Sequence, residues 1–424
     1  MTTQAIELAP PAALVAPVPQ SSLLRERDYV SVLVGQGISA LGSAMTMVAL
    51  PLMVLLLTGS GLLMGVVGIL ETVPDLFIGL PAGVYADRWD RRRVMIFSDA
   101  GRALLTALIP LAVVFGLPVI PVVLIVVGPI NILRVLFSAA ENASIPALAG
   151  RDRLAAAAGY IEAMYALGYV IGPALAGLLI VLIGPGPTIA FDALSFGISA
   201  FSVWLVRRPL VPPAGATQKR VVEEMREGLA YVWSHRPLRN AIAFYVCLAL
   251  AMAPFVPAFT YFLVRERGMD SGGLGVMVSV FSVGMLLGAL AATRLKAGRI
   301  GLRMIAGTLV LGAGLMVGRM VPSTFALGLL GLVVGSSYTL VEVAYVTLRL
   351  AASPDALLGR VTTVAKTVSV GAQPLGMLAG GLLIDRVGGG ATLAAMGAAA
   401  FAIAVGFGMS RALRPARADG GGRP

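Results

Sequence analysis

The sequence has little of the chemistry on which most enzymes and metal sites depend. It contains one cysteine, Cys247, and one histidine, His235, in 424 residues. A single cysteine excludes an intramolecular disulfide and a cysteine metal site. One histidine in a charged stretch leaves no histidine–carboxylate cluster for a metal. Charged residues are also scarce, at 12% of the chain, against about 25% in a soluble domain.

Hydrophobic residues take the place of the missing charges. They make up 58% of the chain, and the mean hydropathy is +0.90. This composition is typical of a polytopic membrane protein with little left for a soluble domain. The net charge of +11 would fit nucleic acid, but no basic soluble domain with aromatic residues carries it. Basic cytoplasmic loops explain it better, so we expect a lipid bilayer and no nucleic acid as partner.

Apolar stretches of about 20 residues are long enough to cross a bilayer as helices. We therefore predict an all-α polytopic membrane protein with transmembrane helices at twelve positions: 29–57, 61–86, 94–116, 119–141, 157–183, 187–206, 240–264, 273–294, 302–320, 324–348, 361–384 and 389–410. Every second connection is rich in arginine and lysine. Since basic loops stay inside, this alternation predicts a multi-pass protein of the plasma membrane with both termini in the cytoplasm.

The spans divide into two related halves. We predict a disordered cytoplasmic tail (1–24), an N-terminal six-helix half (25–206), a cytoplasmic linker (207–239), a C-terminal six-helix half (240–410) and a basic tail (411–424). The linker has a helical period, which predicts an amphipathic helix along the membrane surface. Gly83-Val-Tyr-Ala86 in the first half recurs as Gly288-Ala-Leu-Ala291 in the second, which indicates pseudo-symmetric halves.

The connection between spans two and three carries the most specific motif. It reads Gly83-Val-Tyr-Ala-Asp-Arg-Trp-Asp-Arg-Arg-Arg93. It resembles Gly-x-x-x-Asp-Arg-x-x-Arg-Arg, the signature of the major facilitator superfamily between its second and third helices. Asp90 departs from the many members that have glycine at this position.

The resemblance implies a cytoplasmic gate. In the family, the aspartate at the Asp87 position contacts the N-terminus of span eleven, where the helix dipole favours a carboxylate; here that span starts near Gly359-Arg360-Val361. We expect this contact to close the cytoplasmic side and to break when the halves rock apart. The predicted gate residues are Gly83, Asp87, Arg88, Arg91, Arg92, Asp99 and Arg102. For the loop arginines, a purely topological role as inside anchors is the alternative.

Span five carries a second motif, Gly168-Tyr-Val-Ile-Gly172-Pro173-Ala-Leu-Ala-Gly177. It resembles the Gly-x-x-x-Gly-Pro-x-x-Gly-Gly element of antiporting exporters, with Ala176 in place of one glycine. Gly168 and Gly172 let another helix approach closely, and Pro173 removes a backbone hydrogen bond and bends the helix. Generic packing of small residues is the alternative to an export motif made of Gly168, Gly172, Pro173 and Gly177.

Charged residues inside the spans are candidates for proton coupling. A carboxylate at the bilayer centre costs about 2.5–3.5 kcal/mol, so it normally faces a cavity or a partner. Glu71 and Asp75 lie one turn apart in span two, and Glu342 lies in span ten. Arg134 in span four stands roughly where the family has an arginine, although Ser138 replaces a glycine of that pattern. We predict Glu71 or Asp75 as proton carrier, Glu342 as a further candidate and Arg134 as a modulating cation.

An alternative role for these charged residues is structural. They would then form static ion pairs that hold the helix bundle together. For Asp192, near the outer end of span six, we expect a capping or interfacial position. After Asp28, span one has no acid, although many multidrug exporters of the superfamily keep one there.

Together the motifs resemble those of drug and siderophore exporters, of the macrolide-efflux and enterobactin-exporter type. This resemblance implies a monomeric secondary active transporter that exports a small organic or amphiphilic solute in exchange for protons by alternating access. No Walker phosphate loop is present, so we expect no ATP, no cofactor and no enzyme activity. A proton-coupled importer and a non-transporting membrane sensor or scaffold remain as alternatives, and the sequence does not identify the solute.

Overall fold

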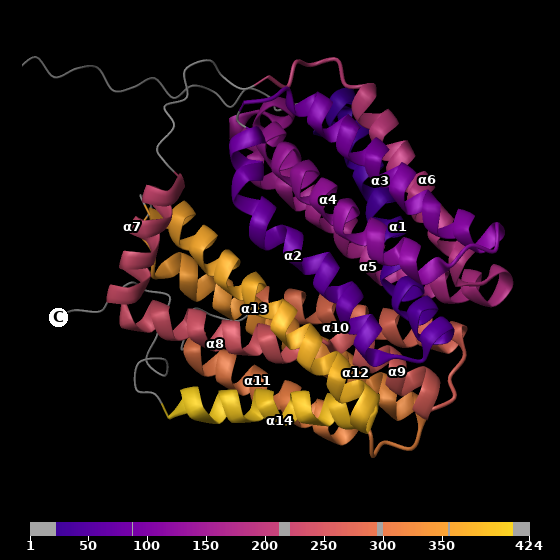
Figure 1. Ribbon diagram of the computed structural model, residues 1–424. Helices are drawn as coiled ribbons and strands as arrows, with labels where there is room; N and C mark the ends of the chain where they lie inside the picture. The colour runs from indigo at the N-terminus through magenta and orange to yellow at the C-terminus, as the bar shows by residue number, and fades with distance from the viewer. Residues whose placement is uncertain (1–22, 87, 212–220, 295–299, 355–356, 410–424) are drawn as a thin grey trace, which may run out of the picture.

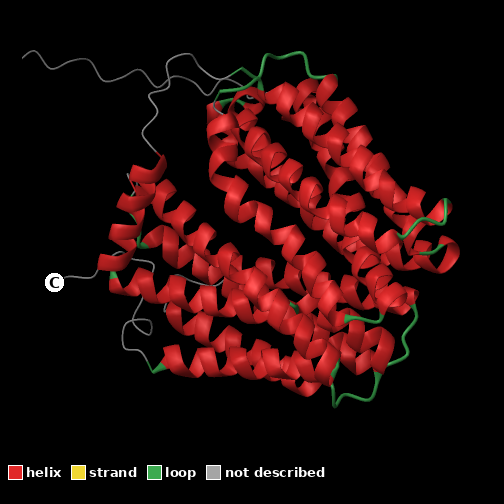
Figure 2. Ribbon diagram, in the orientation of Figure 1, coloured by secondary structure: helices red, strands yellow, loops and turns green. Residues whose placement is uncertain are grey.

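The computed structural model describes residues 23–86, 88–211, 221–294, 300–354 and 357–409. Within these ranges the secondary structure is helical, with no strand (Figure 2). Twelve spans of the described chain are long and apolar enough to cross a membrane. The predicted all-α fold class is therefore confirmed.

The N-terminal half is built from six long helices whose ends follow local turn chemistry. Gly59 caps the C-terminus of α1, and its φ of 66° is the left-handed conformation that glycine adopts without strain. Asp90 caps the N-terminus of α3, and its side chain accepts hydrogen bonds from the Arg92 and Arg93 amides. The helices are α1 (Arg27–Thr58), α2 (Gly61–Ala86), α3 (Arg91–Val114), α4 (Val119–Ala149), α5 (Leu154–Ile183) and α6 (Pro185–Trp204), with short turns η1 (Leu23–Arg25) and η2 (Arg151–Arg153).

The C-terminal half differs mainly in its first span. That span, predicted as one helix, is divided into α8 (Arg236–Met252), α9 (Phe255–Tyr261) and the π-helical turn η3 (Phe262–Glu266). The break falls at Pro254, because proline lacks the N–H that would continue the helix. The other helices are α10 (Ser271–Arg294), α11 (Ile300–Gly318), α12 (Thr324–Ala351), α13 (Leu358–Val387) and α14 (Gly389–Gly408).

A shorter helix, α7 (Val221–Ser234), lies between the halves in sequence and rests on the second half in space. Its Glu227 carboxylate forms an ion pair with Arg360 at the start of α13. The Tyr231 hydroxyl donates a hydrogen bond to the Ala352 carbonyl oxygen at 2.9 Å. Val232 is buried, whereas Trp233 is exposed. In Figure 1, α7 lies at one end of the bundle beside α8 and α13.

The two halves contact each other through equivalent helices. α2 and α5, the second and fifth spans of the first half, meet α13 and α10, the fifth and second spans of the other. Figure 1 shows two bundles that lean together at one end and diverge toward the end where α7 lies. We call the diverging end, where α1, α3, α5, α8, α11 and α13 begin, the basic end, and the other the opposite end.

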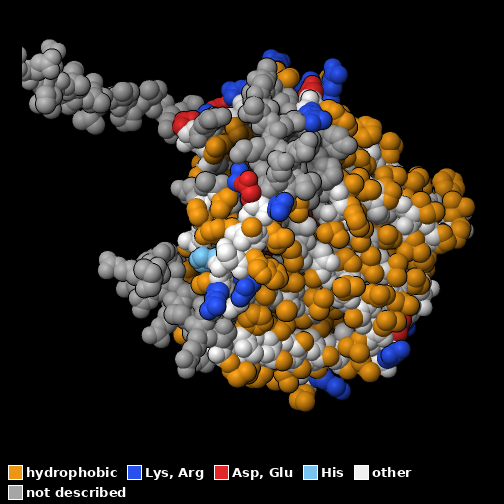
Figure 3. Space-filling view, turned by 60° about the vertical axis from the view of Figure 1, so that its left-hand side comes forward, with side chains coloured by type: hydrophobic (Ala, Val, Ile, Leu, Met, Phe, Trp, Pro, Cys, Tyr) orange, Lys and Arg blue, Asp and Glu red, His pale blue; other side chains and the backbone are white. Residues whose placement is uncertain are grey.

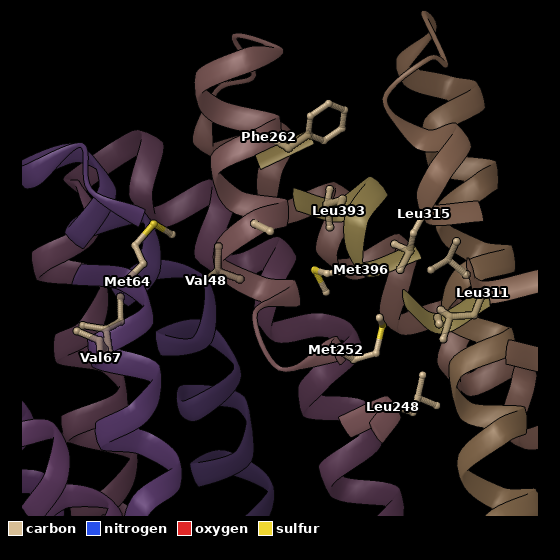
Figure 4. Packing of buried hydrophobic residues seen from close by; sticks show 14 of the residues in the cluster. Val48, Met64, Val67, Leu248, Met252, Phe262, Leu311, Leu315, Leu393 and Met396 are labelled. Carbon is tan, nitrogen blue, oxygen red and sulfur yellow. The ribbon is translucent and has the colours of Figure 1, made fainter. Parts of the chain in front are cut away.

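Hydrophobic side chains fill the bundles and also cover their sides. Leu248 and Met252 of α8 converge with Leu315 of α11 and Met396 of α14 (Figure 4). Many large apolar side chains, such as Phe97, are exposed on the outside. On the face shown in Figure 3, hydrophobic side chains cover the broad middle, and most Lys and Arg side chains lie toward its edges. This distribution fits a surface surrounded by lipid.

Candidate functional site

Glycines allow the two halves to approach closely at the opposite end. A Cβ at Gly65 of α2 would lie 2.6 Å from the Met377 carbonyl oxygen and 3.3 Å from Gly381 Cα, both in α13. On the other side of the interface, a Cβ at Gly177 of α5 would lie 3.0 Å from Gly275 Cα in α10. Backbone-to-backbone contacts of this kind require residues without side chains.

A pair of charged side chains ties the halves together at the same end. The Asp385 carboxylate of α13 accepts hydrogen bonds at the N-terminus of α2, from Ser60 Oγ at 3.1 Å, Leu62 N at 3.0 Å and Gly61 N. Arg265 of η3 donates to the Leu55 carbonyl oxygen in the last turn of α1, at 3.4 Å. An acid thus meets the positive end of one helix dipole, and a base meets the negative end of another. We call this pair of contacts the latch.

The span-five motif serves two helix contacts. A Cβ at Gly168 would lie 2.9 Å from the Ala40 backbone, and one at Gly172 would lie 3.0 Å from the Leu41 carbonyl oxygen, both in α1. Gly177, farther along, faces α10 of the second half. Pro173 lies inside α5 between these contacts. The motif therefore joins packing within the first half to packing between the halves.

A cavity of about 760 Å³ lies at the centre of the molecule, lined by α1 and α5 of the first half and by helices of the second. Its wall is rich in aromatic side chains, including Tyr165 and Tyr169 of α5. Glu162 and Glu342 are the charged residues among the described residues that line it. The cavity has the size and mainly apolar lining of a small-molecule site.

Three of the four predicted proton-coupling residues lie in the first half. The Asp75 carboxylate of α2 forms an ion pair with Arg134 of α4, and Arg134 Nε also donates to Asn131 Oδ1 at 2.9 Å. Glu71 lies one turn from Asp75, close enough for the Arg134 charge to act on it. Glu342 lies apart from them, on the wall of the cavity in α12.

Residues of the predicted gate motif are divided between two places. Asp87 lies outside the described residues, Gly83 is in the last turn of α2, and Arg88 is exposed. Arg91 donates to the Ala143 carbonyl oxygen of α4 at 2.8 Å, and Arg92 donates to the Val203 and Trp204 carbonyl oxygens where α6 ends. These arginines tie α3 to the basic end of the first half.

Asp99 and Arg102 lie elsewhere, inside the first half. They form a buried ion pair of 3.0 Å on one face of α3, and the Arg102 guanidinium lies 3.7 Å from the centre of the Phe196 ring in α6. The sequence predicts both as part of the cytoplasmic gate motif and on one face of the third span, since residues three apart share a face of a helix. In the structure that face is packed against α6 inside the first half.

Sequence reasoning missed Glu141, whose side chain is only 6% exposed. It placed this residue at the end of span four, but α4 continues to Ala149. The apolar residues Ile145, Leu148 and Ala149 after Glu141 are the signal that could have revealed the longer helix. The Tyr165 hydroxyl lies 3.5 Å from Glu141 Oε2.

The expectation of a capping or interfacial position for Asp192 is wrong. Its side chain is 3% exposed and lies within α6. The Ser43 hydroxyl of α1 donates to Asp192 Oδ1 at 3.3 Å. Gly42 makes this possible, because a Cβ there would lie 2.9 Å from Asp192 Cα. Because α1 and α6 cross closely at this point, Asp192 is buried between them and is not at the surface.

Residues 32–377 match the family model described as Major Facilitator Superfamily. The chain belongs to the major facilitator superfamily. It is 32% identical over 372 residues to the multidrug efflux pump Tap of Mycolicibacterium fortuitum, covering 84% of this chain and 88% of Tap. It is 26% identical to macrolide efflux protein A of Streptococcus pyogenes over 376 residues, 85% of this chain and 90% of that protein. These relatives place it in the drug-exporter branch predicted from the motifs.

Solved structures of other members share the fold at low identity. The nucleoside transporter NupG superposes with a TM-score of 0.74 at 12% identity, covering 90% of this chain and 98% of NupG. A bacterial homologue of the iron transporter ferroportin in an inward-facing state gives 0.68 at 15% identity, with 92% and 100% coverage. The family match and the efflux-pump relatives, together with the twelve apolar spans of the described chain, make this protein a multi-pass membrane transporter and not an enzyme.

Proposed function

We propose that the protein exports an amphiphilic organic solute in exchange for protons, by alternating access of the central cavity. The observation that carries this proposal is the position of the cavity between two halves that touch at the opposite end and diverge at the basic end. Relatives named as multidrug and macrolide efflux proteins support export rather than import. The proton gradient is the proposed energy source.

The arginine distribution supports an orientation. Arg91, Arg92, Arg93, Arg207 and Arg208 are all at the basic end. By the positive-inside rule this end, where α1 begins and α14 ends, faces the cytoplasm of a cell membrane. The structure then corresponds to the state that receives solute from the cytoplasm, with the latch closing the outer side.

The cavity chemistry supports the class of solute. Phe255 stacks on Phe259 with ring centroids 5.4 Å apart, and the centroid of the Phe281 ring lies 4.8 Å from that of Phe255. All three line the cavity together with the acids Glu162 and Glu342. Aromatic rings and a few polar groups bind solutes that have both an apolar body and a polar or cationic part.

Erythromycin accumulation in inverted membrane vesicles tests the proposal. Respiration acidifies the lumen of such vesicles, so an exporter that exchanges solute for protons concentrates erythromycin inside them. We expect accumulation that an uncoupler abolishes and that vesicles without the protein do not show. Erythromycin movement out of the acid lumen would favour the importer, and no proton-dependent movement of erythromycin or ethidium would contradict the proposal.

A further inference from the structure

The first half contains a buried cluster of ionisable side chains with more acids than bases. Asp99, Glu141 and Asp192 are 0%, 6% and 3% exposed, and Arg102 is 7% exposed. They come from three helices, α3, α4 and α6. Ionised groups in an apolar interior are costly unless they are paired and hydrogen-bonded. One guanidinium does not balance three carboxylates.

Arg102 is already engaged with Asp99. Its Nη1 atom lies 3.0 Å from Asp99 Oδ1, and its planar face rests on the Phe196 ring. Asp192 has hydroxyl groups as neighbours, since Ser43 and Ser195 both lie 3.3 Å from its Oδ1 atom. Each of these groups therefore has a polar partner within 3.3 Å on one atom, although Asp99 Oδ2 and Arg102 Nε have no hydrogen-bond partner among the described residues.

Glu141 is the least well paired of the four groups. Its Oε1 atom is buried and has no hydrogen-bond partner among the described residues. The other oxygen, Oε2, has only the Tyr165 hydroxyl, at 3.5 Å. In the described part of the chain, no Lys or Arg lies within ion-pair distance of it. A proton on Glu141 removes this uncompensated charge from the apolar interior.

Tyr165 connects this carboxyl with the central cavity. Its side chain lines the cavity, and its hydroxyl lies between Glu141 Oε2, at 3.5 Å, and Gln36 Oε1 of α1, at 3.4 Å. Gln36 Nε2 in turn donates to Ser199 Oγ of α6 at 3.0 Å. A proton that enters the cavity therefore needs to pass a single side chain to reach Glu141.

We propose that Glu141 is a proton-binding carboxyl of the transport cycle and that Tyr165 connects it with the cavity. This rests on the proposed proton exchange and names a carrier beyond Glu71, Asp75 and Glu342. The proton binds to a Glu141 oxygen from the cavity and later leaves by the same route, and no covalent bond to carbon changes. The charged and titratable groups that act on Glu141 are Asp99 and Arg102 on α3 and Glu162 and Tyr165 on α5. Asp192 on α6 and Arg134 on α4 act in turn on Arg102, and Gln36 on α1 lies beside the Tyr165 hydroxyl.

The position of Glu141 beside α5 also connects proton binding with the movement of the two halves. Tyr165 lies on α5, the helix that contacts α1 through Gly168 and Gly172 and α10 of the second half through Gly177. A change of charge at Glu141 is therefore adjacent to a helix that crosses the interface. Coupling between proton binding and transport requires that the proton shift the balance between the two arrangements of the halves. Glu141 is placed to do so through α5.

Purified Glu141→Gln protein in proteoliposomes tests the proposal. Two measurements are compared: exchange of labelled for unlabelled erythromycin at equal pH, and uphill erythromycin uptake into an acid lumen with the pH followed by enclosed pyranine. We expect exchange to persist, which shows that the variant is folded and binds solute. Uphill uptake and the pyranine signal should fall to the level of empty liposomes.

Two further variants separate a proton site from a structural role. Asp152→Asn removes an exposed acid from η2, between the same two helices α4 and α5, and should behave as the wild type. Tyr165→Phe keeps the ring but removes the hydroxyl, and should slow proton movement more than equal-pH exchange. Glu141→Asp should restore part of the uphill uptake.

The outcomes distinguish the two proposals. A wild-type protein without pH-driven erythromycin transport refutes the proposed proton exchange itself. A wild type that is proton-driven, together with a Glu141→Gln variant that keeps full uphill uptake and a full pyranine signal, refutes only the role of Glu141. Loss of equal-pH exchange in Glu141→Gln and Glu141→Asp alike would also overturn it, in favour of a structural carboxyl.

Discussion

The latch formed by Asp385 and Arg265 should set the balance between the two access states. Asp385→Ala removes the carboxylate that accepts hydrogen bonds from Ser60 Oγ, Gly61 N and Leu62 N. A side-chain cap of this kind contributes about 0.5–2 kcal/mol, and we take about 1 kcal/mol because Asp385 is exposed and screened by solvent. Arg265→Ala removes one long hydrogen bond, about 0.5 kcal/mol. The double variant should therefore shift the equilibrium by about 1.5 kcal/mol, roughly tenfold, toward separation at the opposite end.

Distances between spin labels at the opposite end measure this shift. Leu117 and Met320 are exposed in the loops after α3 and α11, so they can be replaced by cysteine in a Cys247→Ser background. We expect double electron–electron resonance of the latch variant to show a longer-distance population that is minor in the parent. A larger separated population should also change the rate of erythromycin exchange.

Asp270→Ala provides a matched control for the latch. Asp270 also caps a helix at the opposite end, since its Oδ1 accepts from Gly273 N at 2.8 Å, but both residues belong to the second half. This variant should lose stability without changing the Leu117–Met320 distances. Unchanged distances in the latch variant, or equal changes in the Asp270→Ala control, would refute the claim that the Asp385 and Arg265 contacts hold the two halves together at the opposite end.

Three further predictions concern the interface, an ion pair and the cavity. Gly275→Val should lower thermal stability in detergent by about 1–3 kcal/mol, because its side chain would meet the α5 backbone near Gly177; an unchanged melting temperature would contradict the close contact. Arg134→Ala should cost about 1–2 kcal/mol by leaving Asp75 unpaired in a partly exposed site, and Asp75→Asn in the same chain should recover much of it; strictly additive losses in a double-mutant cycle would argue against the pair. Glu342→Gln should weaken binding of the cation tetraphenylphosphonium roughly tenfold, about 1.4 kcal/mol, because a negative charge is lost from the cavity wall. Binding of tetraphenylborate, an anion of similar shape, should not change; equal losses of affinity for both ions would show that electrostatics is not the cause.

The membrane topology and the family could be read from the sequence. A bilayer requires about 20 apolar residues for each helix, so the spans appear as separate stretches, and α2 runs over the predicted residues 61–86. Proline, glycine and acidic residues mark the helix ends through local geometry, as at Gly59 and Asp90. Such signals need only neighbouring residues.

The partners of the charged residues could not be read in this way. Asp385 and Gly61 are 324 positions apart in sequence, yet they are hydrogen-bonded, and Glu141 meets Tyr165 across two different helices. Helix periodicity shows that Asp99 and Arg102 share a face, but not that this face is turned to Phe196 inside the first half. Hydropathy records the cost of a buried charge, whereas the close packing of distant helices decides which group offsets that cost, and it leaves Glu141 with only the Tyr165 hydroxyl at 3.5 Å as a hydrogen-bond partner among the described residues.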